Sequence, residues 1–407
     1  MRAAIIGAGP SGFFVAGEIL RRCPGCEVHL FERGIAPYGL VRYGVAPDHG
    51  LTRRTITIFN QIADHPRFYY HGQVEIGRDI TLDALHESFH AVIACVGAEQ
   101  PARPDVPGAR LPGAVDALDI ARWVNGDAEA FDAGQLAGVE SALIIGNGNV
   151  ALDAARMLMR HAADWVSADI APYALEALMH HRVRRIQIVG RRGPHEAAFT
   201  EAELTEVVHM PDWSVHHREP LPFNVTAEKP PFPSTLAFRF HLRLECLLGG
   251  DRVVGARFTN TQNGETVEAP AQLVVFATGH RGVPLGDLPF DPHRGIIPND
   301  HGAVLDAPGF YVCGWIKRGA KGLIGHNKKD AVDTVGRLLE DRDVLAARQI
   351  DPVDWRAVLL AQGLRPVSWP EWRALEAREQ QRGAAVGRPR IPLPRDEMIS
   401  WLNARTP

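Results

Sequence analysis

Glycines at fixed spacing occur in two stretches of this chain, and this spacing suits a turn that holds a diphosphate. The first stretch, "AAIIGAGPSG", places Gly7, Gly9 and Gly12 in the pattern GxGxxG after a short apolar run. Such a turn lets the backbone approach a pyrophosphate, and the following helix directs unpaired N–H groups and its positive dipole end at the phosphates. The next run, "FFVAGEILRR", has helical periodicity. The stretch therefore predicts a dinucleotide site with Gly9 beside the pyrophosphate.

An acidic residue follows this turn at the distance that a ribose requires. The run "EVHLFER" is expected to form a second strand that ends at Glu32, 20 residues after Gly12. A carboxylate at this position accepts hydrogen bonds from the hydroxyl groups of an unphosphorylated ribose. The alternative is a surface glutamate on an ordinary strand–helix unit.

The second glycine stretch, "SALIIGNGNVALDAARML", repeats the pattern with an alanine in the last place. Gly146, Gly148 and Ala151 follow an apolar run, and the next expected strand, "RIQIVGRR", ends in Arg191 and Arg192. Guanidinium groups bind phosphate through paired hydrogen bonds, so this site is expected to prefer a 2′-phosphorylated nicotinamide cofactor, NADPH over NADH. The alternative is a solvated arginine pair at a strand end.

Two such sites in one chain indicate two different redox cofactors. A nicotinamide gives up its electrons only as a hydride, whereas a flavin accepts the pair and passes electrons on singly or together. The acidic first site suits the ADP half of FAD, and the second site suits NADPH. We therefore expect the chain to hold FAD and NADPH.

These turns must be positioned by two units of alternating strands and helices. The apolar runs "AVIACVG" and "LVVFATG" end in Gly97 and Gly279, and a proline-containing crossover follows each of them. We expect an α/β fold with two Rossmann-like, three-layer dinucleotide-binding domains, the NADP domain being inserted into the FAD domain. The expected limits are residues 1–99 and 280–407 for the FAD domain and 100–279 for the NADP domain. Residues 220–233 hold five prolines and are predicted to form a loop.

The composition excludes several other classes of protein. A chain of 407 residues with a net charge of −4 gives no overall electrostatic reason to bind nucleic acid or an anionic membrane. No stretch approaches the roughly 18 consecutive apolar residues of a membrane-spanning helix. The N-terminus lacks the features of a secretory signal and the five cysteines are few, so a cytoplasmic location is expected.

Cysteines and histidines are weighed as redox and metal sites and set aside. Cys23 and Cys26 have CxxC spacing, but they lie between the first helix and the second strand, away from the strand ends where cofactors bind. We expect free thiols in a loop. Cys95, Cys246 and Cys313 stand apart in the sequence and are expected in the core, and the histidine pairs lack ligand companions. No metal site is expected.

Longer motifs are similar to those of a known family. "PYGLVRYGVAPDH", "GNGNVALDAARML", "VGRRGP" with "AFT", "GWIKRGAKGLIG" and "RPVSWPEWRALE" with "GRPR" occur in this order over nearly the whole chain. In these motifs the sequence resembles the adrenodoxin reductase family of NADPH-dependent ferredoxin reductases. Motifs of this length and order are more specific than either glycine turn alone.

The resemblance implies roles for individual residues. The implied FAD contacts are Ser11, Glu32, Leu40, Val74 and Trp315, with the backbone of Gly322, Leu323 and Ile324. The implied NADPH contacts are Asn147, Gly148, Asn149, Val150, Arg191, Arg192 and Glu203, with Gly322 near the nicotinamide. His49 and Asp153 are the implied catalytic pair near the flavin. Hydride transfer between two stacked rings depends on positioning and requires neither a nucleophile nor a metal.

The sequence departs from the family in two places. The family's Gly-Pro-Thr-Gly loop is replaced by residues 319–322, "GAKG", and Lys321 either raises the flavin potential, binds an anionic substrate or points to solvent. The basic segment that docks a ferredoxin in the family is shortened. It carries Glu206, Asp212, Glu219 and Glu228 against only Arg218 and Lys229. The remaining basic run, residues 317–329, could serve a protein partner or the NADPH phosphates.

The leading expectation is a reductase that passes electrons from NADPH through FAD to a ferredoxin-like iron–sulfur protein, which supplies an oxygenase such as a cytochrome P450. A second possibility keeps both cofactors, but the flavin acts directly on a small molecule. A third is a redox-sensing or structural protein that binds dinucleotides without turnover.

Overall fold

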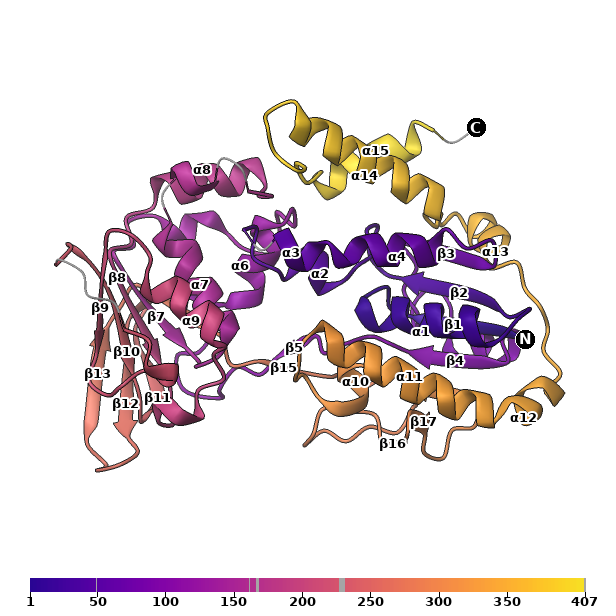
Figure 1. Cartoon of the computed structure of the whole chain (residues 1–407), viewed down its shortest axis with the longest axis horizontal. Helices are drawn as coiled ribbons and strands as arrows, with labels where there is room; N and C mark the ends of the chain where they lie inside the picture. Colours follow the sequence, from indigo (N-terminus) through magenta and orange to yellow (C-terminus); the bar gives the residue numbers. More distant parts are fainter. Residues whose placement is uncertain (49, 161, 166–167, 227–230, 406–407) are drawn as a thin grey trace.

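Two lobes of mixed α/β structure make up the molecule. The structure is a computed structural model of the chain and describes residues 1–48, 50–160, 162–165, 168–226 and 231–405. Figure 1 shows the two lobes side by side, with the C-terminal helices above the first lobe. Parallel sheets with helices packed on them form both lobes, which confirms the expected fold class.

A mainly parallel sheet forms the centre of the first lobe, in the strand order β16-β17-β18-β4-β1-β2-β3. Its strands are β1 (Arg2–Ile6), β2 (Glu27–Glu32), β3 (Phe68–Gly72), β4 (Ala91–Ala94), β16 (Asn299–Asp300), β17 (Ala303–Val304) and β18 (Phe310–Val312). Alternate residues of β1 face opposite layers, because side chains alternate across a strand. Ala3 and Ile5 pack toward one buried cluster, and Ala4 and Ile6 pack toward another.

Helices cover this sheet. They are α1 (Pro10–Arg22), α2 (Leu40–Tyr43), α3 (Gly50–Arg53), α4 (Thr55–Ala63), α5 (Leu82–Ser88), α10 (Trp315–Arg318), α11 (Ile324–Glu340), α12 (Arg342–Ala347) and α13 (Trp355–Ala361). The C-terminal helices are α14 (Trp369–Ala384) and α15 (Arg395–Asn403). Trp369 and Trp372 of α14 are buried in the same cluster as Phe13 of α1, so the C-terminal segment packs on the first lobe.

The second lobe has three layers around a parallel sheet of strand order β6-β14-β7-β8-β10-β9. The strands are β6 (Ala114–Asp116), β7 (Ser141–Ile145), β8 (Arg185–Val189), β9 (Trp213–His217), β10 (Ser234–Arg239) and β14 (Leu273–Phe276). An antiparallel sheet of β11 (Leu242–Gly249), β12 (Val253–Asn260) and β13 (Thr266–Pro270) covers one face. The other face carries α6 (Ala117–Val124), α7 (Asn149–Met159), α8 (Pro172–His180) and α9 (Glu201–Val208). Short 3₁₀ helices are η1 (Ala133–Leu136), η2 (Ala162–Trp165), η3 (Pro194–Glu196) and η4 (Pro222–Asn224).

The chain crosses between the lobes twice, and the two crossings pair with each other. β5 (Gln100–Pro101) and β15 (His280–Arg281) form a short antiparallel ribbon. The ribbon lies between the two lobes in Figure 1. The strands of the second lobe's sheets thus all lie between these crossings in the sequence.

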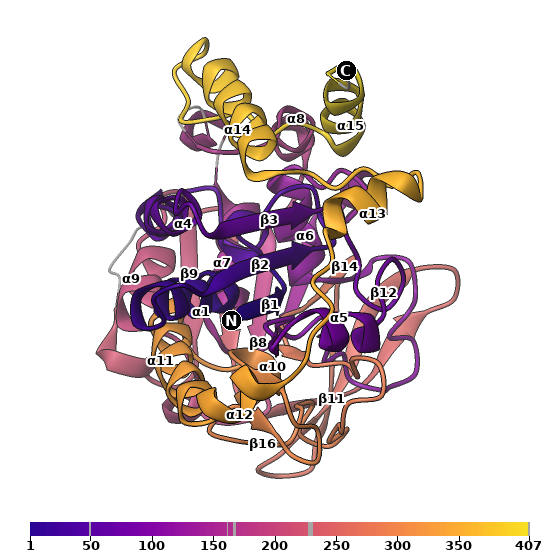
Figure 2. The same ribbon diagram turned by 90° about the vertical axis from the view of Figure 1, so that its right-hand side faces the viewer.

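Buried charged residues connect the lobes and the C-terminal segment. Five of them, Arg42, Glu379, Arg390, Asp169 and Arg53, contact one another in this order and end at the neutral amide of Asn125; these six residues are called the charge chain below. Arg42 of α2 donates to Glu379 of α14 at 2.6 and 2.9 Å. Arg390 donates to Asp169 of the second lobe at 2.8 Å, and Arg53 of α3 contacts the same carboxylate. Figure 2 shows α8, which follows Asp169, on the same side of the molecule as α14 and α15.

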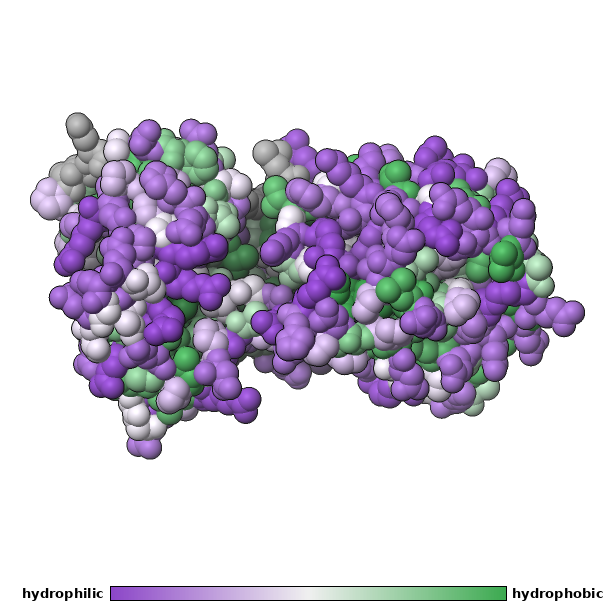
Figure 3. All heavy atoms as spheres, turned by 90° about the horizontal axis from the view of Figure 1, so that it is seen from below, coloured by the Kyte–Doolittle hydropathy of each residue, from purple (hydrophilic) through white to green (hydrophobic). Residues whose placement is uncertain are grey.

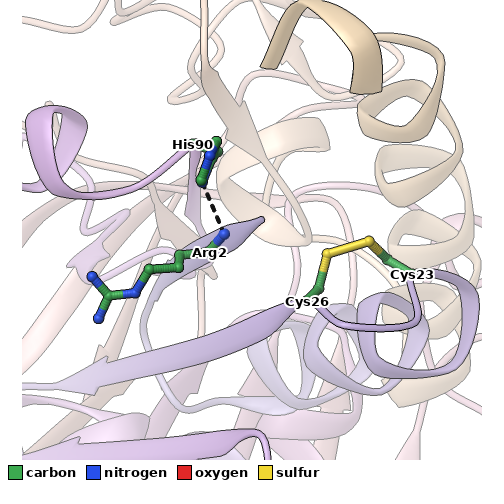
Figure 4. Close-up of a disulfide and its surroundings, with 4 residues drawn as sticks. All are labelled: Arg2, Cys23, Cys26 and His90. Carbon is green, nitrogen blue, oxygen red and sulfur yellow. Dashed lines mark hydrogen bonds between the residues drawn. A yellow bond between two sulfur atoms is a disulfide. The ribbon is translucent and has the colours of Figure 1, made fainter. Parts of the chain in front are cut away.

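Cys23 and Cys26 form a disulfide, so the expectation of free thiols is wrong. α1 ends at Arg22 and β2 begins at Glu27, and the tight connection brings the two Cα atoms within 5.6 Å. Figure 4 shows the bond beside the start of β1, where the backbone N–H of Arg2 donates to His90. This is the edge of the sheet opposite the glycine turn. Of the other cysteines, Cys95 and Cys313 are buried and in contact, and Cys246 is partly exposed.

Among the described helices, none has the length and apolar character needed to cross a bilayer. The described part of the proline-rich segment, residues 220–226 and 231–233, has one turn of 3₁₀ helix and otherwise no helix or strand, as expected of a loop. Residues 227–230 lie outside the described residues.

Candidate active site

The first glycine turn joins β1 to α1 so closely that side chains do not fit. Gly7 has a positive φ of 102°, and a Cβ there would lie 2.6 Å from the carbonyl oxygen of Cys95. A Cβ at Gly12 would lie 2.1 Å from the carbonyl oxygen of Gly7, so the helix packs directly on the turn. At Gly9, in contrast, a Cβ would meet nothing within 4 Å. The backbone at Gly9 therefore faces open space beside the start of α1, which fits a pyrophosphate.

Glu32 lies at the end of β2, beside this turn. Its carboxylate accepts hydrogen bonds from the backbone N–H of Ala8 at 2.8 Å and of Gly34 at 2.9 Å. Burial raises the pKa of Glu32 above its ordinary value, although the two N–H groups act in the opposite direction. The carboxylate is thus fixed next to the glycine turn, where the ribose of a bound dinucleotide would lie.

Further segments converge on the same turn. The N–H of Tyr38 donates to the carbonyl of Ala8 at 2.7 Å, which places the start of the stretch 38–48 against it. A Cβ at Gly314, whose φ is 78°, would lie 2.0 Å from Oγ of the buried Ser11. Trp315 comes next, and its indole N–H is buried without a hydrogen-bond partner among the described residues. An unpaired buried donor fits a polar group of a bound cofactor.

The other implied FAD contacts lie on three segments and differ in how exposed they are. Val74 is buried and its N–H donates to the carbonyl of Glu32 at 2.9 Å. Leu40 begins α2 and is half-buried. Gly322 has a φ of 83° and precedes α11, and Leu323 is 66% exposed. The loop before α11 is therefore accessible from outside the protein.

The second glycine turn repeats the design of the first. Gly146 has a φ of 140°, and a Cβ there would lie 2.3 Å from the carbonyl oxygen of Ala277. The side chain of Asn147 lies over Gly190, where a Cβ would be only 1.6 Å from its amide nitrogen. Gly148 is the N-cap of α7, and no side chain from the described residues caps this helix end. The free helix end fits a second pyrophosphate.

Asn149 and Val150 begin α7 and have different surroundings. The side-chain oxygen of Asn149 accepts from the N–H of Thr200 at 2.8 Å, which ties the helix to the segment before α9. Val150 is 53% exposed. An exposed apolar side chain at the rim of the turn is available to a ligand.

Arg191 and Arg192 follow β8 with fixed backbones and exposed side chains. The carbonyl of Arg191 accepts from the hydroxyl of Thr261 at 3.3 Å, and that of Arg192 accepts from the N–H of His241 at 3.1 Å. Neither guanidinium forms an ion pair with a carboxylate in the described part of the chain. Two exposed guanidinium groups at this position fit a 2′-phosphate.

A fully buried arginine that the sequence analysis missed joins the two predicted catalytic regions. Arg156 of α7 contacts Asp153 at 2.5 Å and Glu203 of α9 at 3.5 Å. It also contacts Asp48 at 3.2 Å and Glu206 at 2.8 Å. These five residues are called the Arg156 cluster below.

The Arg156 cluster places the end of the stretch 38–48 against the second glycine unit. Arg160 adds a second contact, at 2.8 Å, to Asp48. His49 lies outside the described residues, so only its neighbour Asp48 is placed. The spacing of Asp153 and Arg156 is a signal that the sequence did offer, because residues three apart share one face of a helix.

A cavity of about 910 Å³ lies beside the second site, near the arginine pair. Its lining includes Arg218, Glu219, Arg239 and His241. Its lining contains none of the residues predicted for the site. Figure 3 shows a separate hollow between the lobes, with apolar side chains inside it.

Comparisons with known proteins show which proteins this chain is similar to. Residues 1–193 match the family of pyridine nucleotide-disulphide oxidoreductases. NADPH:adrenodoxin oxidoreductase from mouse mitochondria is 34% identical over 98% of this chain and 91% of its own length. A probable ferredoxin/ferredoxin–NADP reductase of Mycobacterium tuberculosis is 38% identical over 96% of this chain and 73% of its own length. The structure of M. tuberculosis FprA in complex with NADPH is 33% identical, covers 99% of both chains and has a TM-score of 0.90.

Proposed function

The chain belongs to the family of NADPH:adrenodoxin oxidoreductases and ferredoxin–NADP reductases, and on that basis we propose that it passes electrons from NADPH through FAD to a ferredoxin-type iron–sulfur protein. One observation supports the proposal most strongly. The two glycine turns have opposite charges at the ribose position, with Glu32 after β2 and two exposed arginines after β8. This difference suits FAD in the first lobe and NADPH in the second.

In this proposal the FAD domain consists of residues 1–99 and 280–407, and the NADP domain of residues 100–279. The paired crossings β5 and β15 support limits at these points. Gly9 and the start of α1 would hold the pyrophosphate of FAD, Glu32 would hold its ribose, and Trp315 and the Gly322 loop would contact the flavin part. Asn147 to Val150 hold the NADPH pyrophosphate, and Arg191 and Arg192 bind its 2′-phosphate.

The chemistry that bound FAD supplies is acceptance of a hydride and onward release of electrons. The protein's own contribution is positioning, because a hydride moves only between closely stacked rings. His49 and Asp153 are assigned to the region where the two rings meet. The guanidinium of Arg156 contacts both Asp153 and Asp48, and Asp48 directly precedes His49. Arg156 is therefore a positioning residue in this scheme.

Anaerobic mixing of the FAD-loaded protein with stoichiometric NADPH tests the first half of the function. Rapid bleaching of the flavin absorbance is expected with NADPH, and much slower bleaching with NADH. Slow bleaching with both would favour a protein that binds dinucleotides without turnover. The second half is tested with an acidic [2Fe–2S] ferredoxin and the neutral quinone menadione as acceptors. Turnover with menadione but none with ferredoxins would favour direct action on a small molecule.

The cytoplasm is the proposed location, supported by the low cysteine count. The Cys23–Cys26 bond is a feature that a reducing compartment would act against. Fractionation of cells that express the native gene, with immunodetection of the protein, tests the location.

A further inference from the structure

Lysine is rare in this protein and concentrated in one place. The chain has 44 lysines and arginines, of which only five are lysines. Four of the five lie in the thirteen residues from 317 to 329, around the Gly322 loop and the first turns of α11. Elsewhere almost every positive charge is an arginine. This segment therefore differs from the rest of the chain in the chemistry of its cations.

Two of the cations in this segment have structural roles. Lys317 donates to Asp333 at 2.6 Å and to the hydroxyl of Thr334 at 3.1 Å. Arg318 contacts Asp330 at 2.6 Å and Asn327 at 2.8 Å. These contacts hold α10 and the Gly322 loop on α11, and they neutralise the two carboxylates of α11 nearest to the loop.

The other three cations remain exposed. Lys321, Lys328 and Lys329 are exposed, and none of them forms an ion pair with a described carboxylate. Val332 lies one turn beyond Lys328 and Lys329 and is 44% exposed. Positive charges around an accessible apolar side chain are typical of a transient protein interface. We call Lys321, Lys328, Lys329 and Val332 the lysine surface.

The lysine surface lies next to the proposed flavin loop. Lys321 directly precedes Gly322, and Lys329 is five residues into α11, or about 8 Å along the helix axis from Ile324. Figure 1 shows the start of α11 at the end of the first lobe that faces the second lobe. A partner bound here would sit close to the site from which electrons leave.

The segment that docks the partner in the resembled family offers no comparable charge in this chain. Glu206 is already engaged by Arg156 and Arg160, at 2.8 Å in each case. Beyond α9, residues 209–226 carry Asp212 and Glu219 against Arg218. An acidic partner would gain little attraction there.

We propose that the lysine surface is the docking face for an acidic iron–sulfur protein. This inference rests on the proposed electron transfer to such a protein. The choice of lysine has a physical reason: arginine forms rigid, forked ion pairs, as Arg318 does here, whereas the lysine ammonium is a hydrated, flexible point charge. Hydrated point charges attract an acidic partner over a distance without requiring one fixed ion-pair geometry.

The test uses the FAD-loaded protein, NADPH and an acidic [2Fe–2S] ferredoxin, with menadione as a neutral acceptor. The double variant Lys328→Gln/Lys329→Gln is expected to raise the KM for ferredoxin about tenfold at low salt and to weaken its dependence on ionic strength. Menadione reduction stays unchanged. Lys328→Arg/Lys329→Arg restores the KM, because the charge is retained. Adding Lys321→Gln to the double variant raises the KM further.

A matched control removes the same kind of charge elsewhere. Arg110, Arg243 and Arg252 are exposed in the second lobe, and Gln at all three positions is expected to leave the ferredoxin KM unchanged. An unchanged KM in the lysine variants, or an equal rise in the arginine control, would overturn the docking face. If the unaltered protein turns over menadione normally but does not reduce ferredoxin, the proposed function itself is wrong.

Discussion

In the proposed function, single side chains decide which dinucleotide each lobe binds. After β2 the deciding group is a half-buried carboxylate held by two N–H groups, and after β8 it is a pair of exposed guanidinium groups. These positions were predictable from the sequence, because the glycine spacing fixes where the next strand ends. The geometry of Gly7, Gly12 and Gly146 leaves no room for a side chain, as the motif predicts.

The arginine pair is expected to select NADPH. Arg191→Ala/Arg192→Ala removes the charge-assisted hydrogen bonds to the 2′-phosphate, so KM for NADPH rises about 100-fold while KM for NADH is unchanged. Steady-state menadione reduction with each nucleotide measures this. Arg185→Ala, an exposed arginine at the opposite end of β8, is the control. A parallel rise for both nucleotides would show that the pair does not recognise the phosphate.

Arg156 is expected to control the rate of flavin reduction more than nucleotide affinity. Arg156→Lys keeps the charge but loses the fork that contacts Asp48 and Asp153 together. The segments that carry Asp48 and Asp153 would then shift slightly relative to each other. We expect this shift to slow hydride transfer about 100-fold at saturating NADPH, with little change in the Kd for NADPH. Stopped-flow flavin absorbance gives both values. A wild-type rate in this variant would assign Arg156 a purely structural role.

The contact between Arg156 and Asp48 was beyond the sequence analysis. Asp48 and Arg156 are 108 positions apart, and only the folded chain brings them together at 3.2 Å. A buried arginine also looks like any surface arginine in a sequence, because its burial depends on partners from other elements.

At the level of elements, neighbouring strands of the first lobe carry a buried pair of histidines. His29 of β2 and His71 of β3 are joined by a ring-nitrogen hydrogen bond of 3.1 Å, and their rings are stacked. Burial, followed by the charges of His71 and Arg2, lowers the pKa of His29 to about 3. Burial, followed by the charge of Arg356, lowers the pKa of His71 to about 4. Both rings are therefore neutral in the folded protein at neutral pH.

This pair is expected to make the fold sensitive to acid. Between the ordinary histidine pKa of 6.5 and the lowered values, the unfolded chain binds more protons than the folded one, so stability falls as pH falls. From pH 6.5 to pH 5 the loss is about 2 kcal/mol for each histidine. Urea unfolding at pH 7 and pH 5 measures it. His29→Gln/His71→Gln should reduce the difference between the two pH values, whereas the exposed-site change His195→Gln should not.

The elements themselves were largely predictable, and the exception is instructive. α1 was expected from the helical periodicity of "FFVAGEILRR" and begins three residues earlier, at Pro10. The bond between Cys23 and Cys26 was missed because CxxC spacing is equally compatible with free thiols. Whether the two thiols can form a bond depends on how sharply the chain turns between α1 and β2. The pattern of residue types does not show how sharp this turn is.

At the scale of the whole molecule, the charge chain holds three parts of the protein together. Asp169 of the second lobe lies between Arg53 of the first lobe and Arg390 of the C-terminal segment. Burial alone would raise the pKa of Asp169, but Arg390 and Arg53 outweigh it and hold the pKa below its ordinary value. The carboxylate is thus ionised and shared between two buried cations.

Neutralising Asp169 is expected to destabilise the protein strongly. Asp169→Asn leaves two buried guanidinium groups without their counter-charge and costs about 3 to 5 kcal/mol of the free energy of unfolding. Asp127→Asn is the control, because its partner Arg122 is exposed and such a pair contributes about 1 kcal/mol or less. Urea denaturation measures both. A loss no larger than in the control would mean that the charge chain does not stabilise the contact between the lobes.

The ribbon of β5 and β15 has a consequence for the history of the chain. Because Gln100–Pro101 pairs with His280–Arg281, the second lobe leaves the first and returns to it at one point. Cutting both strands of the ribbon frees a unit whose two ends are neighbours and can be ligated to each other. A gene fragment coding for such a unit can be acquired, exchanged or lost by recombination while the strand order of the first lobe's sheet stays the same, so the two proposed nucleotide specificities can evolve as separable modules.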